Sequence, residues 1–172
     1  MNSRLSLNRA YTIAVTDVLV LTAVYFIPAF THAAQFPLYI YEPMRLLLFA
    51  ALLISRNNTN AFLLALTLPL VSTIFPPHHP PFYKAVIMSL ELFVNVACFV
   101  WAVNKIKWPP FILFFISTVI SKVFYYGLKL FFINQGLIEG KLVTTDLLTQ
   151  LITLSILSLL FALFYKRQQT KN

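Results

Sequence analysis

Residues 82–103 are apolar enough to cross a membrane, yet they include Lys84, Glu91 and Asn95. A spanning helix needs roughly 17–25 mostly apolar residues, and each ionisable residue inside it costs about 2.5–3.5 kcal/mol on insertion scales. The three polar residues follow one another at spacings of seven and four, so they share one face of a helix. Lipid cannot solvate such a face, which therefore has to point into a bundle of further helices.

The rest of the chain supplies five more apolar segments. Of its 172 residues, 59% are hydrophobic and 10% are charged, whereas about a quarter of the residues of a typical soluble domain are charged. We therefore expect an all-α integral membrane protein with one domain, residues 1–172, built as a six-helix bundle. The expected spans are residues 10–30, 37–55, 61–75, 82–103, 109–133 and 142–165.

The basic residues between the spans predict the orientation. One set of connections holds eight of them: Arg4, Arg9, Arg56, Lys105, Lys107, Lys166, Arg167 and Lys171. The other set holds two, Lys84 and Lys141. Cytoplasmic loops carry the excess of lysine and arginine, so both termini are expected in the cytoplasm, with six spans between them.

In this orientation, polar side chains from several helices fall in the outer half of the bundle, while Asp17 lies at or below its middle. We expect them to line an outward-opening pocket that binds a small polar molecule, with Tyr39 and Tyr41 as further walls. The candidate binding residues are Glu42, Arg45, Lys84, Glu91, Asn95, Lys122, Tyr125, Tyr126, Lys129, Asp146 and Gln150.

Four of these residues are basic and three are acidic, which favours an anionic or zwitterionic ligand. Glu91 and Lys122 lie too deep to reach the headgroups easily, so we expect them to pair with one another when no ligand is bound. Structural roles stay open for the rest of the charged set. Glu42 and Arg45 can be a local pair, lysines near the surface can extend to headgroups, and Asp146 suits the first turn of a helix.

Several kinds of chemistry have little support in the sequence. The single cysteine, Cys98, excludes an internal disulfide and a cysteine metal cluster. The three glycines cannot form a glycine-rich phosphate loop. His32, His78 and His79 have no metal-ligand spacing. The basic residues are scattered between apolar spans, so nucleic acid is not an expected partner. We expect no cofactor, no metal and no catalytic set.

The order of short motifs gives a further indication. The first span ends in Ile27-Pro28, and the second opens with FPLYIYEPMRLLL at residues 36–48. The third contains Leu68-Pro69-Leu70 and leads into PPHHPP at residues 76–81. The fourth reads YKAVIMSLELFVNVACF at residues 83–99. This order resembles the membrane-embedded substrate-binding (S) components of energy-coupling factor (ECF) transporters, which import vitamins and related micronutrients.

The resemblance implies a six-helix fold with an outward-open pocket formed by outer loops and by the outer halves of the fourth to sixth helices. It also implies a transmembrane coupling subunit and ATPase subunits as partners. In such proteins, small residues at four-residue spacing on the first helix dock the coupling subunit; in this chain Ala10 and Ala14 match that spacing.

Two other classes of function remain open. A membrane scaffold of the cell-shape machinery can have a similar six-helix fold, and its polar faces would then bind partner helices. An intramembrane enzyme is the third alternative, and it lacks a recognisable catalytic set in this sequence.

Overall fold

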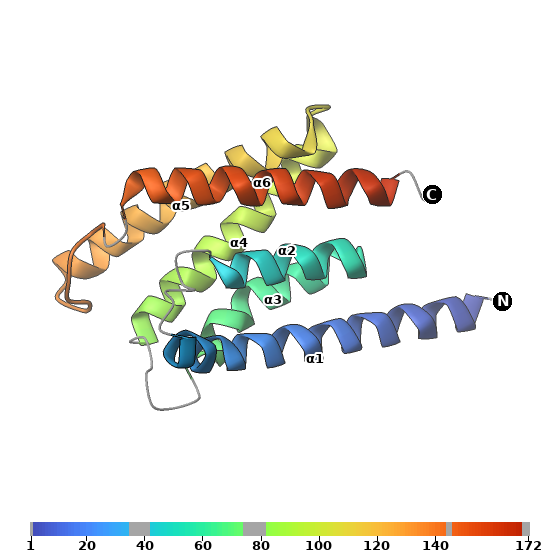
Figure 1. Cartoon of the computed structure of the whole chain (residues 1–172), viewed down its shortest axis with the longest axis horizontal. Coiled ribbons are helices and arrows are strands. Elements are labelled where there is room, and N and C mark those ends of the chain that lie inside the picture. The colour runs from blue at the N-terminus through green and yellow to red at the C-terminus, as the bar shows by residue number, and fades with distance from the viewer. Residues whose placement is uncertain (1, 35–41, 74–81, 144–145, 170–172) are drawn as a thin grey trace.

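In the computed structural model of the chain, the structure describes residues 2–34, 42–73, 82–143 and 146–169. All regular secondary structure in these ranges is helical, as expected. The helices are α1 (Asn2–Ala34), α2 (Pro43–Ser55), α3 (Asn58–Val71), α4 (Phe82–Lys105), α5 (Pro110–Asn134) and α6 (Leu147–Gln169). Figure 1 shows successive helices running back and forth, so that the start of α1 and the end of α6 lie at the same end of the bundle.

Four of the helices, α1, α4, α5 and α6, are long and apolar enough to cross a membrane. Their outer surfaces are rich in exposed apolar side chains such as Val123, Leu148 and Leu163. Buried positions, in contrast, include many polar side chains, among them Asn95 and Ser121. An apolar exterior around a partly polar interior is the arrangement that a lipid environment requires, and it indicates a membrane protein.

The helices α2 and α3 are shorter, with 13 and 14 residues. At 1.5 Å per residue each is about 20 Å long, whereas the hydrocarbon core of a bilayer is about 30 Å thick. The expected second span, residues 37–55, becomes helical only at Pro43, and residues 37–41 lie outside the described ranges. The two short helices pack as a hairpin between α1 and α4 (Figure 1).

The turn between α2 and α3 explains where both helices end. Arg56 adopts a left-handed conformation with φ 49°, and its N–H donates to the carbonyl of Leu52 at 2.9 Å. The Asn57 side chain then accepts hydrogen bonds from the N–H groups of Thr59 and Asn60. An asparagine at this position satisfies donors that have no partner within the helix. The third helix therefore starts at Asn58 and not at residue 61, the expected start.

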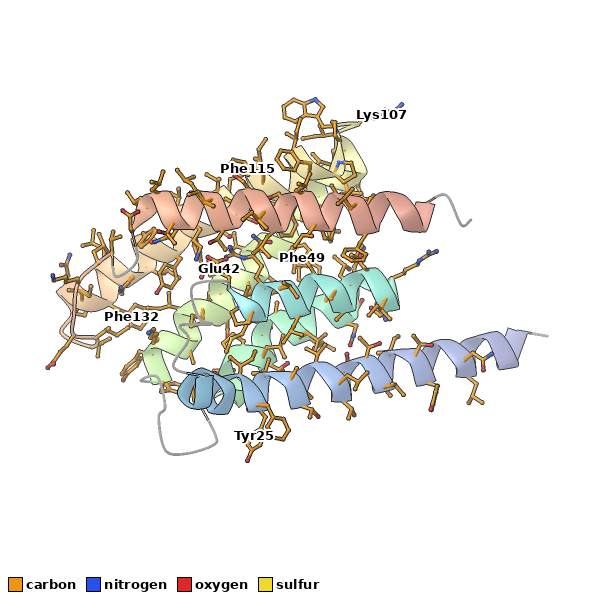
Figure 2. All side chains as sticks on the ribbon, viewed as in Figure 1. Tyr25, Glu42, Phe49, Lys107, Phe115 and Phe132 are labelled. Carbon is orange, nitrogen blue, oxygen red and sulfur yellow. The ribbon has the colours of Figure 1, made fainter. Side chains whose placement is uncertain are left out.

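Aromatic side chains fill the centre of the bundle. Phe49, Phe99, Phe114 and Phe161, here called the phenylalanine cluster, come from α2, α4, α5 and α6, and all four are buried. In Figure 2, Phe49 lies between the helices, whereas Tyr25 and Lys107 project from the outside of the bundle. The cluster joins the short α2 to three of the long helices, and this contact places the first turn of α2 beside α4 and α5.

Candidate functional site: a buried ring of charges

Four charged side chains meet inside the bundle and form a closed ring, here called the charge ring. Arg45 donates from Nη1 to Glu42 Oε2 and from Nη2 to Glu91 Oε1. The Nζ of Lys122 lies 2.5 Å from Glu42 Oε1 and 3.2 Å from Glu91 Oε1. Positive and negative groups thus alternate around the ring, which contains two of each. The expected pairing of Glu91 with Lys122 is confirmed.

The ring has a buried side and a more open side. The side chains of Arg45 and Glu91 are 2% and 6% exposed, whereas those of Glu42 and Lys122 are 21% and 24% exposed. Arg45 and Glu91 therefore form the buried side of the ring, and Glu42 and Lys122 form its more exposed side. Burying ions is costly unless they are paired and hydrogen-bonded, and the ring provides both.

The backbone at the start of α2 positions two ring members together. Glu42 immediately precedes the helix with φ 48°, and its carbonyl accepts from the N–H groups of Arg45 and Leu46 at 3.0 and 3.2 Å. Its side chain makes no capping bond to the helix, so the carboxylate is available to Arg45 and Lys122. The left-handed conformation of Glu42 is uncommon for a residue other than glycine. Pro43 follows at the first helical position, where the fixed φ of proline favours the start of a helix.

Next to the ring lies a set of uncharged polar groups between α4 and α5, here called the hydroxyl layer: Asn95, Ser117, Thr118 and Ser121. The Asn95 Nδ2 donates to Thr118 Oγ1 at 3.0 Å and to Ser121 Oγ at 2.9 Å. Each hydroxyl in turn donates to a backbone carbonyl of its own helix, Phe114 O or Thr118 O. Of this layer only Asn95 was a candidate from sequence, although the serines and threonine lie within one to two turns of Lys122 on α5.

Two buried polar atoms in this region have no hydrogen-bond partner among the described residues: Arg45 Nε and Asn95 Oδ1. One is a donor and the other is an acceptor. Leaving such a group unsatisfied costs about 1–3 kcal/mol. Asn95 follows Glu91 by one helical turn, and Glu91 binds Arg45 directly, so both atoms belong to the same polar region.

The tyrosines and Gln150 border the ring on the α5 and α6 side. Lys122 Nζ lies 5.4 Å from the centre of the Tyr125 ring, within the range of a cation–π contact. The Tyr125 and Tyr126 rings meet edge to face at 5.3 Å. The hydroxyl of Tyr126 donates to Gln150 Oε1 at 2.8 Å and so links α5 to α6. The other candidate wall, Tyr39 and Tyr41, lies outside the described residues.

Three other candidates are placed away from the ring. Lys129 donates from Nζ to the carbonyls of Lys141 and Leu142, both at 2.8 Å, and so ties α5 to the following connection. Asp146 Oδ2 accepts from the N–H of Thr149 at the start of α6, as a residue preceding a helix often does. Lys84 is exposed in the first turn of α4. The expected excess of basic over acidic candidates included these three residues. Without them, the ring has two basic and two acidic side chains and no excess of positive charge.

Asp17, which was expected at or below the middle of the bundle and was not among the candidate binding residues, has a partner on α3. Its Oδ1 accepts a hydrogen bond of 2.7 Å from Asn60 Nδ2. This contact joins α1 to α3 and does not involve the charge ring. Among the described residues, no three His, Cys, Asp or Glu side chains gather as metal ligands.

A pocket that the sequence did not indicate lies near the turn between α2 and α3, toward the opposite end of α2 from the charge ring. Its volume is about 270 Å³. The lining residues of this inner pocket are Leu52, Leu53, Arg56, Asn58, Phe99, Val100, Val103, Asn104, Phe161 and Tyr165. It thus combines an aliphatic and aromatic wall with a guanidinium, two amides and a phenol.

Comparisons with known proteins give no match for the chain. No family model matches it, and neither a curated protein nor a solved structure matches it.

Proposed function

We propose that the chain is the membrane-embedded substrate-binding subunit of an ECF-type importer and that it captures a small polar metabolite at the charge ring. The observation that carries this proposal is the buried ring of four paired charges. Beside it, Arg45 Nε and Asn95 Oδ1 have no hydrogen-bond partner among the described residues. A purely structural network gains stability when all its polar groups are satisfied. A binding region, in contrast, keeps hydrogen-bonding capacity for its ligand.

The balance of charge in the ring suggests the class of solute. With two cations and two anions, the ring suits a zwitterion better than a simple anion. The solute's negative group would bind Arg45 and Lys122, and its positive group would bind Glu42 and Glu91. Each ring member would then exchange one ionic partner for another, so no charge would be left uncompensated, which is the costly outcome in a buried site.

The proposed import needs partner subunits. The three glycines of the chain cannot form a phosphate-binding loop, so ATP would be hydrolysed by separate ATPase subunits joined through a transmembrane coupling subunit. In this proposal the protein resides in a bacterial cytoplasmic membrane, with the termini and the turn at Asn57 on the cytoplasmic side. The excess of basic residues at that end supports this orientation.

Native mass spectrometry of the protein, extracted gently from its source membrane, tests the proposal. We expect a co-purifying zwitterionic metabolite, together with coupling and ATPase subunits. The Lys122→Met variant should carry less of the metabolite, because it lacks one cation of the charge ring. A parent protein that carries no small molecule and no ATPase would contradict the proposal.

A membrane scaffold is the second candidate, and one observation favours it. Every charge in the ring already has a partner within the protein, as a structural network would. In that case the extracted protein would carry other membrane proteins, and changes in the charge ring that preserve the fold would leave those complexes intact.

Cysteine labelling tests the proposed orientation. In a Cys98→Ser background, single cysteines at Asn58 and at Lys141 should react with a membrane-impermeant thiol reagent from opposite sides, the first from the cytoplasm. Both positions are exposed, so poor access would not explain a negative result. Labelling of both cysteines from the same side of the membrane would contradict the proposed topology of six spans.

A further inference from the structure

The lining of the inner pocket changes from apolar to polar between its floor and its rim. At the floor, Phe99 and Phe161 are 3% and 6% exposed. At the rim, Arg56, Asn58 and Asn104 are exposed. Asn104 follows Phe99 on α4 and lies about 8 Å nearer the end of that helix. The inner pocket is therefore amphipathic along the direction of the helices.

Hydrogen bonds of the backbone hold two of the rim residues in place. Arg56 ends α2, and its N–H donates to the carbonyl of Leu52. Asn57 then accepts from the first turn of α3, which begins at Asn58. Because both helix ends are defined by such bonds, Arg56 and Asn58 belong to a structured turn, and their side chains share one rim with Asn104.

The rim is recessed from the end of α1. The hydrogen bond from Asn60 Nδ2 to Asp17 Oδ1 places the first turn of α3 beside the middle of α1. The apolar span of α1 begins at Ala10, and Asp17 lies about 10 Å inside that point. Asn57 is only about 5 Å farther out than Asn60. The rim thus lies at a depth where lipid surrounds the protein, and polar groups there need polar partners.

The charge at the rim favours an anion as that partner. The described lining residues include the guanidinium of Arg56 and no carboxylate. Lys105 and Lys107, at and just after the end of α4, add positive charge at this end of the bundle. A guanidinium has five donors, so it can bind a phosphate and keep the contacts that Arg56 makes within the protein. Basic pockets between membrane helices bind the headgroups of anionic lipids in this way.

We propose that the inner pocket binds an anionic phospholipid of the surrounding leaflet. The lipid phosphate accepts hydrogen bonds from Arg56 and from the amides of Asn58 and Asn104. The first part of an acyl chain lies against Phe99 and Phe161. A free phosphate ion offers the same anion but leaves the apolar floor without a partner. The proposal requires a membrane protein but not a transporter, so it is independent of the proposed import.

The volume of the inner pocket agrees with part of a lipid as its occupant. Sites that enclose a whole small ligand measure about 300–1,000 Å³, and this pocket measures about 270 Å³. That is the volume of about nine water molecules at about 30 Å³ each. A phosphate and a short segment of chain occupy such a space, and the rest of the lipid remains in the bilayer.

Quenching of single tryptophans by brominated lipids tests the site. Tyr165→Trp places a reporter in the pocket lining, with the exposed Trp101 and Trp108 both changed to phenylalanine. The full chain is reconstituted in vesicles of phosphatidylcholine and phosphatidylglycerol, and the chains of one lipid at a time carry bromine. The reporter at 165 should favour phosphatidylglycerol about fivefold, the effect of about one basic side chain near a membrane surface.

A second reporter separates the inner pocket from the general lipid surface. Trp101 is exposed on α4 and is not a lining residue, although Val100 and Val103 on the same turn line the pocket. In a protein with Trp108→Phe alone, Trp101 should show a clearly smaller preference for phosphatidylglycerol than the reporter at 165. Both reporters lie at a similar depth, so depth does not account for the difference.

Three substitutions assign the preference to the rim. Arg56→Gln removes the cation and should lower the preference at 165 to that of Trp101. Asn58→Asp leaves Arg56 intact but adds a negative charge, and should act in the same direction. A carboxylate suits the first turn of a helix, so α3 should still form. Lys107→Gln is the matched control, because it also removes one positive charge, but Lys107 projects from the outside of the bundle (Figure 2). It should leave the preference unchanged.

Three results would overturn the lipid site. They are equal preferences at 165 and at Trp101, a preference at 165 that survives both Arg56→Gln and Asn58→Asp, and an equal loss with Lys107→Gln. Inorganic phosphate, compared with chloride at the same ionic strength, distinguishes a lipid from a free anion. It should not reduce the preference at 165. If it abolishes that preference, the inner pocket is a site for free phosphate and the lipid proposal is wrong.

Discussion

Arg45→Met is expected to lower the free energy of unfolding by about 3–5 kcal/mol, the usual cost of removing one partner from a buried ion pair. Arg45 is 2% exposed and binds both Glu42 and Glu91. Methionine keeps much of the side-chain volume but leaves two carboxylates with Lys122 as their remaining cation in the ring. The ring would then carry a net negative charge in a medium that solvates it poorly. Unfolding of the detergent-solubilised protein, followed by circular dichroism, measures the loss.

A double variant separates charge from packing in this experiment. Adding Glu91→Gln to Arg45→Met restores neutrality, since Lys122 and Glu42 remain. The double variant should lose at least about 1 kcal/mol less than the sum of the two single losses, as expected for residues in direct contact. Lys105→Met, an exposed change at the end of α4, is the control and should cost less than about 1 kcal/mol. If the two losses of stability are strictly additive, Arg45 and Glu91 do not stabilise one another in the folded protein.

The second large effect is expected on solute binding and not on folding. Lys122 is 24% exposed, so Lys122→Met should fold, but it removes a charge-assisted hydrogen bond worth about 1.5–3 kcal/mol. At about 1.4 kcal/mol per tenfold change, this corresponds to affinity weaker by about 10- to 100-fold. Glu91→Gln should weaken binding in the same direction, and because Glu91 is buried and paired with Arg45 it should lower the stability as well. Titration with the metabolite identified by native mass spectrometry measures both variants.

Lys84→Met is the matched control for these variants, because it removes a lysine that is exposed on α4 and outside the ring. Its affinity for the solute should equal that of the parent. If Lys122→Met and Glu91→Gln both fold and bind or import the solute like the parent, the charge ring is not a binding site. The scaffold hypothesis would then be favoured.

The long helices could be predicted because their apolar runs are long and have clear ends. The expected span 82–103 begins at the same residue as α4 and ends two residues before it, and the expected span 109–133 differs from α5 by one residue at each end. The expected start of the sixth span at residue 142 was early. The helix starts at Leu147, since Asp146 binds the N–H of Thr149 and thereby marks the boundary. Apolar residues before such a boundary look the same in the sequence as apolar residues after it.

The site was predictable as a set of charged residues, but not as a geometry. Depth in the membrane identified Glu91 and Lys122 as partners. Lys129 lies away from the charge ring because its Nζ donates hydrogen bonds to the carbonyls of Lys141 and Leu142. The path of this connection after α5 could not be predicted from the sequence. The phenylalanine cluster could not be foreseen for a different reason. The chain has 17 phenylalanines, and in a membrane protein both the lipid-facing and the interior surfaces accept them.

The neutrality of the charge ring has an electrical consequence for the proposed importer. Moving one elementary charge across a membrane involves about 2.3 kcal/mol for each 100 mV of potential. Two positive and two negative groups that move together do no net electrical work, and a zwitterion carried with them adds none. The membrane voltage then neither drives nor opposes uptake. Accumulation of the solute against a gradient would have to draw on chemical energy, which the proposed ATPase partners would provide.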